Sequence, residues 1–159
     1  MSGIAWKYNL PSSVCSMTNL PSFSSAKSND PLNQWIVSGS TGGVVTIFGA
    51  KTGEIVMENR LHGDDVRSIV TMPPPTVVNY GFSGATKKQT NLLPFLVTTS
   101  FDGTAAMWSI KNKKFERLAV LQGAHTDKVL GCSVLPWSQQ ILTSGADGKI
   151  ALWSAPEDY

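Results

Sequence analysis

The residues with the clearest chemical potential in this chain are two histidines, His62 and His125, which are its only ones. An imidazole works as a general base or a metal ligand when a carboxylate orients one of its nitrogens. Each histidine is followed by a hydroxyl, an aspartate and a tryptophan in the same order, as His62, Thr99, Asp102 and Trp108 and as His125, Ser144, Asp147 and Trp153. These groups could equally hold strands together, because indole, hydroxyl, imidazole and carboxylate form a hydrogen-bonded chain that ends satisfied.

Two further patterns contain the residue types of a ligand site. Gly39–Gly43 is glycine-rich, but no lysine follows it and it opens no helix, so it lacks the features of a phosphate-binding loop. Asp64 and Asp65, with Asp102, have the carboxylates of a metal site. The same residues are expected if Asp64 and Asp65 are solvated loop charges and Asp102 is a hydrogen-bonded structural residue. We therefore expect no catalytic residue, no metal site, no cofactor and no small-molecule substrate.

Composition limits the partners and the location. The 159 residues are 42% hydrophobic and 15% charged with a net charge of +2, and the charges are scattered, which gives no electrostatic footprint for nucleic acid or an acidic membrane. The sequence has neither an apolar run of about 18 residues nor a signal-peptide pattern, so no membrane span is expected. Cys15 and Cys132 are expected to be buried free thiols in a reducing compartment. The expected location is the cytoplasm or the nucleus.

The elements that position the two histidine sets belong to an internal repeat. Three segments align without gaps, each starting with Val and ending in Leu or Met followed by Pro: Val14–Pro21, Val66–Pro73 and Val129–Pro136. Each predicts a short strand that Pro ends, because Pro has no N–H for a sheet ladder.

A predicted hairpin follows each of these strands. The hairpins are Ile36–Phe48, Val97–Trp108 and Leu142–Trp153, and the last two have Asp-Gly at the turn, a strong hairpin signal. Asp102 and Asp147 are 45 residues apart, as are Trp108 and Trp153. A period of about 40–45 residues with four strands per unit is typical of a β-propeller blade.

The fourth strands complete the division of the chain. Glu54–Met57 and Phe115–Leu121 follow the first two hairpins, whereas the third is followed only by the C-terminus. We expect one domain over residues 1–159, in which an N-terminal strand, 4–9, completes the last blade. The predicted blades are blade one (14–58), blade two (62–121, with an inserted loop over 73–94) and a last blade (125–154).

These residues resemble the WD-repeat (tryptophan–aspartate repeat) β-propeller family, whose pattern covers nearly the whole chain apart from two loops. The best copy runs from Gly123 to Trp153. The resemblance implies that each set of His, hydroxyl, Asp and Trp is a structural tetrad, in which Trp bonds the hydroxyl, the hydroxyl bonds His, and His faces Asp. The first blade departs from the pattern, with Leu10, Thr41 and Phe48 where His, Asp and Trp are expected.

The resemblance also implies a non-enzymatic platform for protein partners. In this family, partners usually bind at the narrower face, through the residues just before the first-strand Val and just before the turn Asp. The candidate partner-binding residues are Ser13, Asp65, Lys128, Phe101, Ala146 and Arg67, with Trp6 and Trp137 as weaker ones. Phe101 stands out because an exposed aromatic anchor contributes most to an interface.

Three blades are too few for a ring, because propellers ordinarily close with about 4–8. We expect an all-β, partial propeller completed by a second copy, which gives six blades, or by a partner protein; the competing interpretation is a truncated product of a longer chain.

Two alternatives for function stay open. One is an RNA-associated subunit that uses Lys87, Lys88, Lys111, Lys113 and Lys114; the other is a purely architectural half-propeller.

Overall fold

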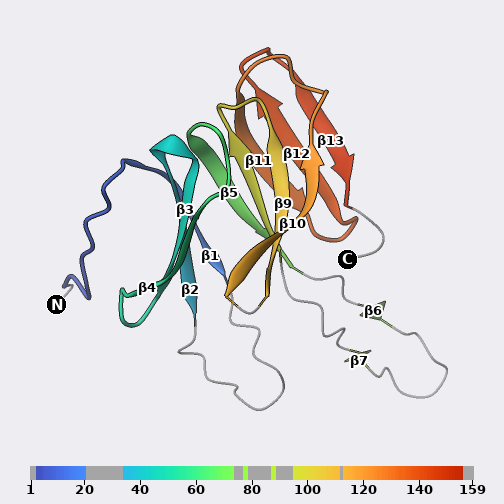
Figure 1. Ribbon diagram of the computed structural model, residues 1–159. Coiled ribbons are helices and arrows are strands. Elements are labelled where there is room, and N and C mark those ends of the chain that lie inside the picture. Colours follow the sequence, from blue (N-terminus) through green and yellow to red (C-terminus); the bar gives the residue numbers. More distant parts are fainter. Residues whose placement is uncertain are drawn as a thin grey trace.

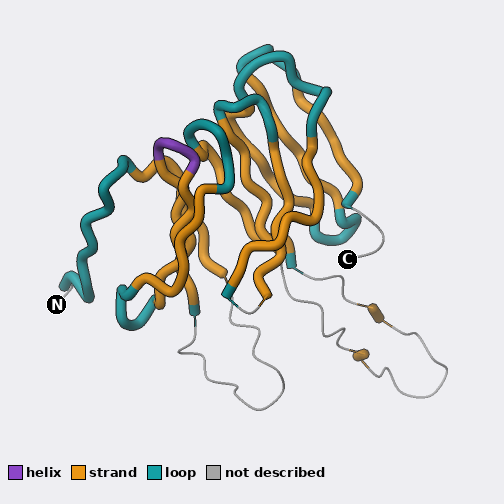
Figure 2. Tube along the Cα trace, in the orientation of Figure 1, coloured by secondary structure: helices purple, strands orange, loops and turns teal. Residues whose placement is uncertain are grey.

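The fold is all-β, as predicted, and is seen in a computed structural model of the chain (Figure 1). The structure describes residues 3–20, 34–73, 77–78, 87–88, 95–111 and 113–155. These residues form three antiparallel sheets of four, four and three strands, and a two-stranded ribbon. The only helical element among them is one short 3₁₀ turn, coloured purple in Figure 2.

Each sheet is built from consecutive strands of one repeat. The first sheet contains β1 (Val14–Leu20), β2 (Trp35–Ser40), the 3₁₀ turn η1 (Thr41–Gly43), β3 (Val44–Gly49) and β4 (Ile55–Arg60). The second contains β5 (Val66–Met72), β8 (Phe95–Ser100), β9 (Ala105–Lys111) and β10 (Lys114–Leu121). The third contains β11 (Val129–Leu135), β12 (Gln140–Gly145) and β13 (Ile150–Ser154). The ribbon of β6 (Val77–Val78) and β7 (Lys87–Lys88) lies within the inserted segment 73–94.

Local sequence explains where these strands turn. Gly103 and Gly148 have φ angles of +83° and +75°, which the Asp-Gly hairpins need and which glycine adopts without a steric cost. In the first of these turns the Asp102 side chain accepts the Thr104 N–H at 2.9 Å. The strands β5 and β11 each end at the residue before a proline, as expected of a residue that cannot donate to the ladder.

The sheets are arranged radially around their first strands. β5 contacts both β1 and β11, so the first strand of each sheet lies innermost (Figure 1). Hydrogen bonds join these strands: Ser16 Oγ donates to the Val66 carbonyl at 3.1 Å, and Thr71 Oγ1 donates to the Asn19 carbonyl at 2.8 Å. This is the arrangement of blades around a propeller axis.

The hydrophobic core consists of two layers between the sheets. One layer joins the first sheet to the second, and includes Val37 and Ile47 against Leu96 and Trp108. The other joins the second sheet to the third, and includes Val97 and Met107 against Ile141. The second sheet is therefore covered on both faces, and every residue of β8 is buried.

The N-terminal segment does not form the strand predicted over residues 4–9. It runs along the first sheet (Figure 1), where Trp6 Nε1 donates to the Ala50 carbonyl at 2.8 Å and the Trp6 and Phe48 ring centroids are 6.1 Å apart. The first and third sheets lie on opposite sides of the second, so within one copy of the chain this segment is far from β13. The third sheet consequently has three strands among the described residues.

Candidate functional site: two tetrads and the end of the sheets

The second sheet carries a closed hydrogen-bonded tetrad. His62 lies in the loop before β5, Thr98 on β8, Asp102 in the β8–β9 turn and Trp108 on β9. The Trp108 indole donates to Thr98 Oγ1 at 2.8 Å, and His62 Nε2 lies 2.7 Å from the same oxygen. On its other side, His62 Nδ1 lies 3.0 Å from Asp102 Oδ2. The network joins β8, β9 and the turn between them to the loop that precedes β5.

The third sheet repeats this arrangement with a second tetrad. The Trp153 indole donates to Thr143 Oγ1 at 2.8 Å, and His125 Nε2 lies 2.8 Å from that oxygen. His125 Nδ1 lies 3.2 Å from Asp147 Oδ1, and Asp147 Oδ2 also accepts the Thr126 N–H at 2.9 Å. Equivalent atoms are thus bonded in both sheets.

The hydroxyl members are Thr98 and Thr143, one position before the predicted Thr99 and Ser144. Alternate residues of a strand point to opposite faces. Trp108 pairs with Leu96 and Trp153 with Ile141, so the residue two positions after each partner shares the face of the indole. Thr99 faces the other side of the second sheet and is buried, and Ser144 is exposed on the far face of the third.

The electrostatics of the first tetrad favour a neutral imidazole. Burial lowers the pKa of His62 below its usual 6.5, against the opposing effect of the Asp102 charge and hydrogen bond. The neutral ring can donate from Nδ1 to Asp102 and accept the Thr98 hydroxyl at Nε2, which satisfies every member. Burial alone would raise the pKa of Asp102, but hydrogen bonds from the Thr104 side chain and the Gly63 N–H lower it overall.

In the second tetrad, Asp147 is held ionised. The Thr126 N–H is the largest influence, and together with the His125 hydrogen bond and charge and the Lys149 N–H it lowers the pKa of Asp147 to about 2, against a smaller effect of burial. Its side chain is only 5% exposed. A carboxylate bound by two backbone N–H groups and an imidazole serves to hold its loop in place.

Both histidines are therefore occupied by structural partners. A groove of about 550 Å³ passes the first tetrad, lined in part by Arg60, His62, Asp102, Trp108 and Arg117. The His62 imidazole in this groove already has Asp102 and Thr98 as hydrogen-bond partners. Within the described residues no group of three or more His, Cys, Asp or Glu side chains could hold a metal ion.

The first sheet contains the remnant of a third tetrad. Phe48 pairs with Ile36, as Trp108 pairs with Leu96, so Ser38 occupies the position of Thr98. Ser38 is 2% exposed and its Oγ has no hydrogen-bond partner among the described residues. Phe48 supplies no donor in place of an indole. The sequence shows the departure at Phe48, whereas the position of Ser38 follows only from the strand register.

Backbone hydrogen bonds bring the predicted partner-binding residues to one end of the three sheets. The residue before each turn donates its N–H to the residue before each first strand. The pairs are Thr41 to Ser13 at 2.9 Å, Phe101 to Asp65 at 3.0 Å and Ala146 to Lys128 at 2.9 Å. Thr41 therefore takes the position of Phe101, whereas the sequence had predicted it at the position of the turn Asp. Positions separated by 18 to 36 residues in sequence thus meet at equivalent points of each sheet.

Phe101 forms the centre of a cationic cluster at this end. The Arg67 guanidinium carbon lies 4.9 Å and the Lys128 Nζ lies 4.4 Å from the ring centroid of Phe101. The ring is half-buried, and both cations are exposed. We call Phe101, Arg67 and Lys128 the Phe101 cluster. Its members come from the β8–β9 turn, β5 and the loop before β11, so tertiary structure assembles it.

The acidic residues near the cluster bind backbone amides. Asp65 Oδ1 accepts the Gly42 N–H at 3.0 Å, and Asp127 Oδ1 accepts the N–H of Lys128 at 2.7 Å. Among the described residues, Arg67 and Lys128 have no carboxylate oxygen within salt-bridge distance. Asp65 therefore has a structural role between the first two sheets, and the cluster keeps two cations unneutralised.

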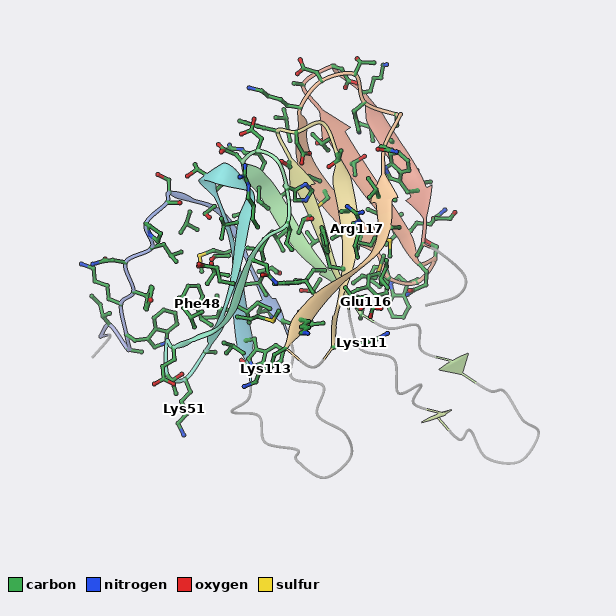
Figure 3. All side chains as sticks on the ribbon, in the orientation of Figure 1. Phe48, Lys51, Lys111, Lys113, Glu116 and Arg117 are labelled. Carbon is green, nitrogen blue, oxygen red and sulfur yellow. The ribbon has the colours of Figure 1, made fainter. Side chains whose placement is uncertain are left out.

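The remaining candidates lie elsewhere. Trp137 is 99% exposed in the β11–β12 turn, and Trp6 packs on the first sheet. Lys111 forms an ion pair of 3.2 Å with Glu116 (Figure 3), which neutralises part of the lysine-rich turn. The side chains of Lys87 and Lys88 lie outside the described residues.

The two cysteines are free, and both are half-buried rather than buried. Burial raises the pKa of the Cys132 thiol to about 11. A thiol with so high a pKa is almost entirely protonated near neutral pH, and the thiolate is the reactive form.

Radial antiparallel sheets held by His–hydroxyl–Trp–Asp tetrads are the blades of a β-propeller. Residues 115–154 match the WD40 family model, described as WD domain, G-beta repeat, and this stretch runs from β10 to β13. The predicted resemblance is confirmed there: the chain contains a WD40 repeat, a type of domain that generally mediates protein–protein interaction without catalysis. No curated protein matches the chain. Among the described residues, no helix is long and apolar enough to cross a membrane.

Proposed function

We propose that this chain is a non-enzymatic interaction scaffold, a WD-repeat subunit of a larger assembly, which binds an acidic segment of a partner protein at the Phe101 cluster. The observation that carries the proposal is the placement of two unneutralised cations, Arg67 and Lys128, within 4.9 Å and 4.4 Å of the centroid of one half-exposed aromatic ring.

The cluster combines features of an interface anchor. Aromatic and arginine side chains dominate binding energy at interfaces. A guanidinium binds a carboxylate in a bidentate geometry, and its contact with Phe101, at about 0.5–1 kcal/mol for an exposed pair, limits its motion before a partner arrives. The backbone bond from Phe101 to Asp65 fixes the turn that carries the ring. A partner with carboxylates beside an apolar residue matches both the charge and the ring.

A catalytic role is not proposed, because the two histidines are saturated by their tetrads. We place the scaffold in the cytoplasm or the nucleus, because Cys15 and Cys132 are free thiols and those compartments keep thiols reduced.

A binding measurement tests the proposal. A fluorescent oligoglutamate peptide with one central leucine is titrated at low salt with the wild-type chain, with Phe101→Ala and with Arg67→Gln. Wild type is expected to bind, and both variants to lose at least tenfold in affinity. Trp137→Ala is the matched control, since that side chain is exposed outside the cluster. Equal affinity of all four proteins would overturn the proposal.

The two alternatives have their own outcomes. A fluorescent oligouridine tests the RNA-associated alternative: binding that Lys113→Ala with Lys114→Ala abolishes, and that Phe101→Ala leaves intact, would replace the acidic-peptide proposal. In a pull-down from native extract, one stoichiometric partner indicates the architectural alternative, whereas several substoichiometric clients lost with Phe101→Ala support the scaffold.

A further inference from the structure

The third sheet exposes an apolar face that has no covering layer among the described residues. Ile150 and Leu152 on β13 are 77% and 55% exposed, and Leu135 on β11 is also exposed. Leu152 pairs with Leu142, and Leu135 pairs with Gln140, so these side chains share the face that points away from the second sheet. We call this face, which Ile150, Leu152 and Leu135 define, the third-sheet face.

The equivalent side chains of the other two sheets are buried. Equivalent positions are found by aligning Trp153 with Phe48 and by aligning the prolines that follow the first strands. In the first sheet, Val45 and Ile47 correspond to Ile150 and Leu152, and Leu20 corresponds to Leu135. In the second sheet the equivalents are Ala105, Met107 and Met72. All six lie in the core layers between sheets. The third-sheet face is thus a sheet-packing surface of the same kind, left uncovered.

Both packed examples show what covers such a face. The first sheet's apolar face meets the tetrad side of the second sheet, through Leu96 and Trp108. The second sheet's apolar face meets the tetrad side of the third, through Ile141 and Trp153. The chain therefore repeats one heterologous contact, in which an apolar face packs on the tetrad side of the next sheet.

Among the described residues, one tetrad side has no sheet packed on it, and it belongs to the first sheet. Ile36, Ser38 and Phe48 lie on this side, and so does Met17, which pairs with Ser38. Met17 is 61% exposed, whereas Ile69, its equivalent in the second sheet, is buried. Of the described residues, those of the N-terminal segment lie on this side, where the Trp6 and Tyr8 ring centroids are 6.1 Å and 5.5 Å from that of Phe48. We call this side, with Met17 and Ser38, the first-sheet face.

We infer that the third-sheet face of one copy of this chain docks on the first-sheet face of a second copy, head to tail. The inference rests on the sheets being WD-repeat blades, as the proposed function does, but not on the Phe101 cluster. It continues the contact already made twice within the chain. Two copies joined at both pairs of faces form a closed ring of six blades, within the usual range of about 4–8.

The N-terminal segment supplies the fourth strand in this assembly. Among the described residues, the backbone of 4–9 makes no hydrogen bond to another backbone group, and β13 has a free edge in the third sheet. In sequence, residues 4–8 precede Leu10, which takes the place of the tetrad His in the first repeat, just as β4 precedes His62 in the second. Docking brings this segment of the second copy beside β13, where it pairs and removes the exposed edge.

Two charge variants test the orientation of the contact. One carries Ile150→Lys with Leu152→Lys, and the other carries Met17→Lys; all three side chains are exposed, so each copy keeps its fold. Light scattering should give the wild type a mass of twice the 17.1 kDa of one chain. Each variant alone should be monomeric, and circular dichroism should show an unchanged strand content for both.

Mixing the variants gives the decisive result. The mixture retains one intact pair of faces, Met17 of one protein against Ile150 and Leu152 of the other, so it should form a heterodimer. Trp137→Ala should dimerise like the wild type. A folded wild-type monomer overturns the inference. Monomer from the β13 variant with unchanged dimer from Met17→Lys also overturns it, because that outcome indicates association between two third-sheet faces.

The dimerisation test and the peptide-binding test of the proposed function can fail independently. Phe101→Ala should dimerise normally while losing the acidic peptide. Dimerisation without peptide binding therefore contradicts only the proposed partner site, and peptide binding by a folded monomer contradicts only the head-to-tail contact.

Discussion

The Trp108 indole reaches the Thr98 hydroxyl across two strands of the second sheet, at 2.8 Å, and the two groups are buried together. Thr98 also meets His62, so one hydroxyl serves as the junction between β8, β9 and the loop before β5. The same junction recurs at Thr143. This hydroxyl is the member of the tetrad that contacts both the indole and the imidazole.

Removing the junction hydroxyl is expected to destabilise the fold. Thr98→Val keeps the shape of the side chain but leaves the Trp108 N–H and the His62 nitrogen without a partner, at a cost of about 1–3 kcal/mol for a buried unsatisfied group. Ser144→Ala, at the position predicted from sequence, should change the free energy of unfolding by less than about 0.5 kcal/mol, as surface substitutions do. Denaturant unfolding measures both. Equal effects would show that Thr98 is not the junction.

Gly43 is expected to tolerate no side chain. Its φ is +83°, and a Cβ would meet the His62 carbonyl, while its own carbonyl accepts the Leu61 and His62 N–H groups. Gly42 is a matched control, with a φ of +76° and open space around its Cβ position. Gly42→Ala should cost about 1 kcal/mol from backbone strain alone, and Gly43→Ala clearly more. Thermal unfolding compares them, and equal melting temperatures would contradict the close approach.

Stability is expected to fall on acidification in two stages. The pKa of folded His62 is below 6.5, so below about pH 6.5 the unfolded chain binds more protons and stability decreases. The pKa of folded Asp147 is about 2 against 3.8 in the unfolded chain, so its contribution, present at higher pH, is lost as pH falls through this range. Unfolding titrations at several pH values should show that Asp147→Asn reduces the lower stage and leaves the upper one unchanged; Asp102, whose folded pKa is also lowered, accounts for the remainder of the lower stage. A wild-type profile without that stage would contradict the role of Asp147.

Lys128 is expected to contribute to acidic-partner binding through charge. Lys128→Gln removes the cation 4.4 Å from the Phe101 ring and should weaken oligoglutamate binding while leaving the melting temperature unchanged, because the side chain is exposed. The affinity of the wild type should fall with added salt, and that of Lys128→Gln less steeply, because screening acts on exposed charges. Identical salt dependence of the two proteins would exclude an electrostatic role.

The amino-acid sequence by itself determined the repeat, the strands of the three sheets and three members of each tetrad, but not the conformation of residues 4–9. Val at the start of each first strand, Pro at its end and the 45-residue spacing of Asp102 and Asp147 are local signals. His62, Asp102 and Trp108 are identified by type, because each is scarce in the chain. The predicted Thr99 and the observed Thr98 are neighbouring threonines, which residue type alone does not distinguish.

Only the tertiary structure decided which face each side chain occupies and which faces remain uncovered. The pairing of Trp108 with Leu96 selects Thr98 and reveals Ser38 as its counterpart, because side-chain direction alternates along a strand and depends on register. The position of the N-terminal segment and the exposure of Met17 and Ile150 depend on where whole sheets lie. Burial is a property of neighbours distant in sequence, which no local pattern in the chain specifies.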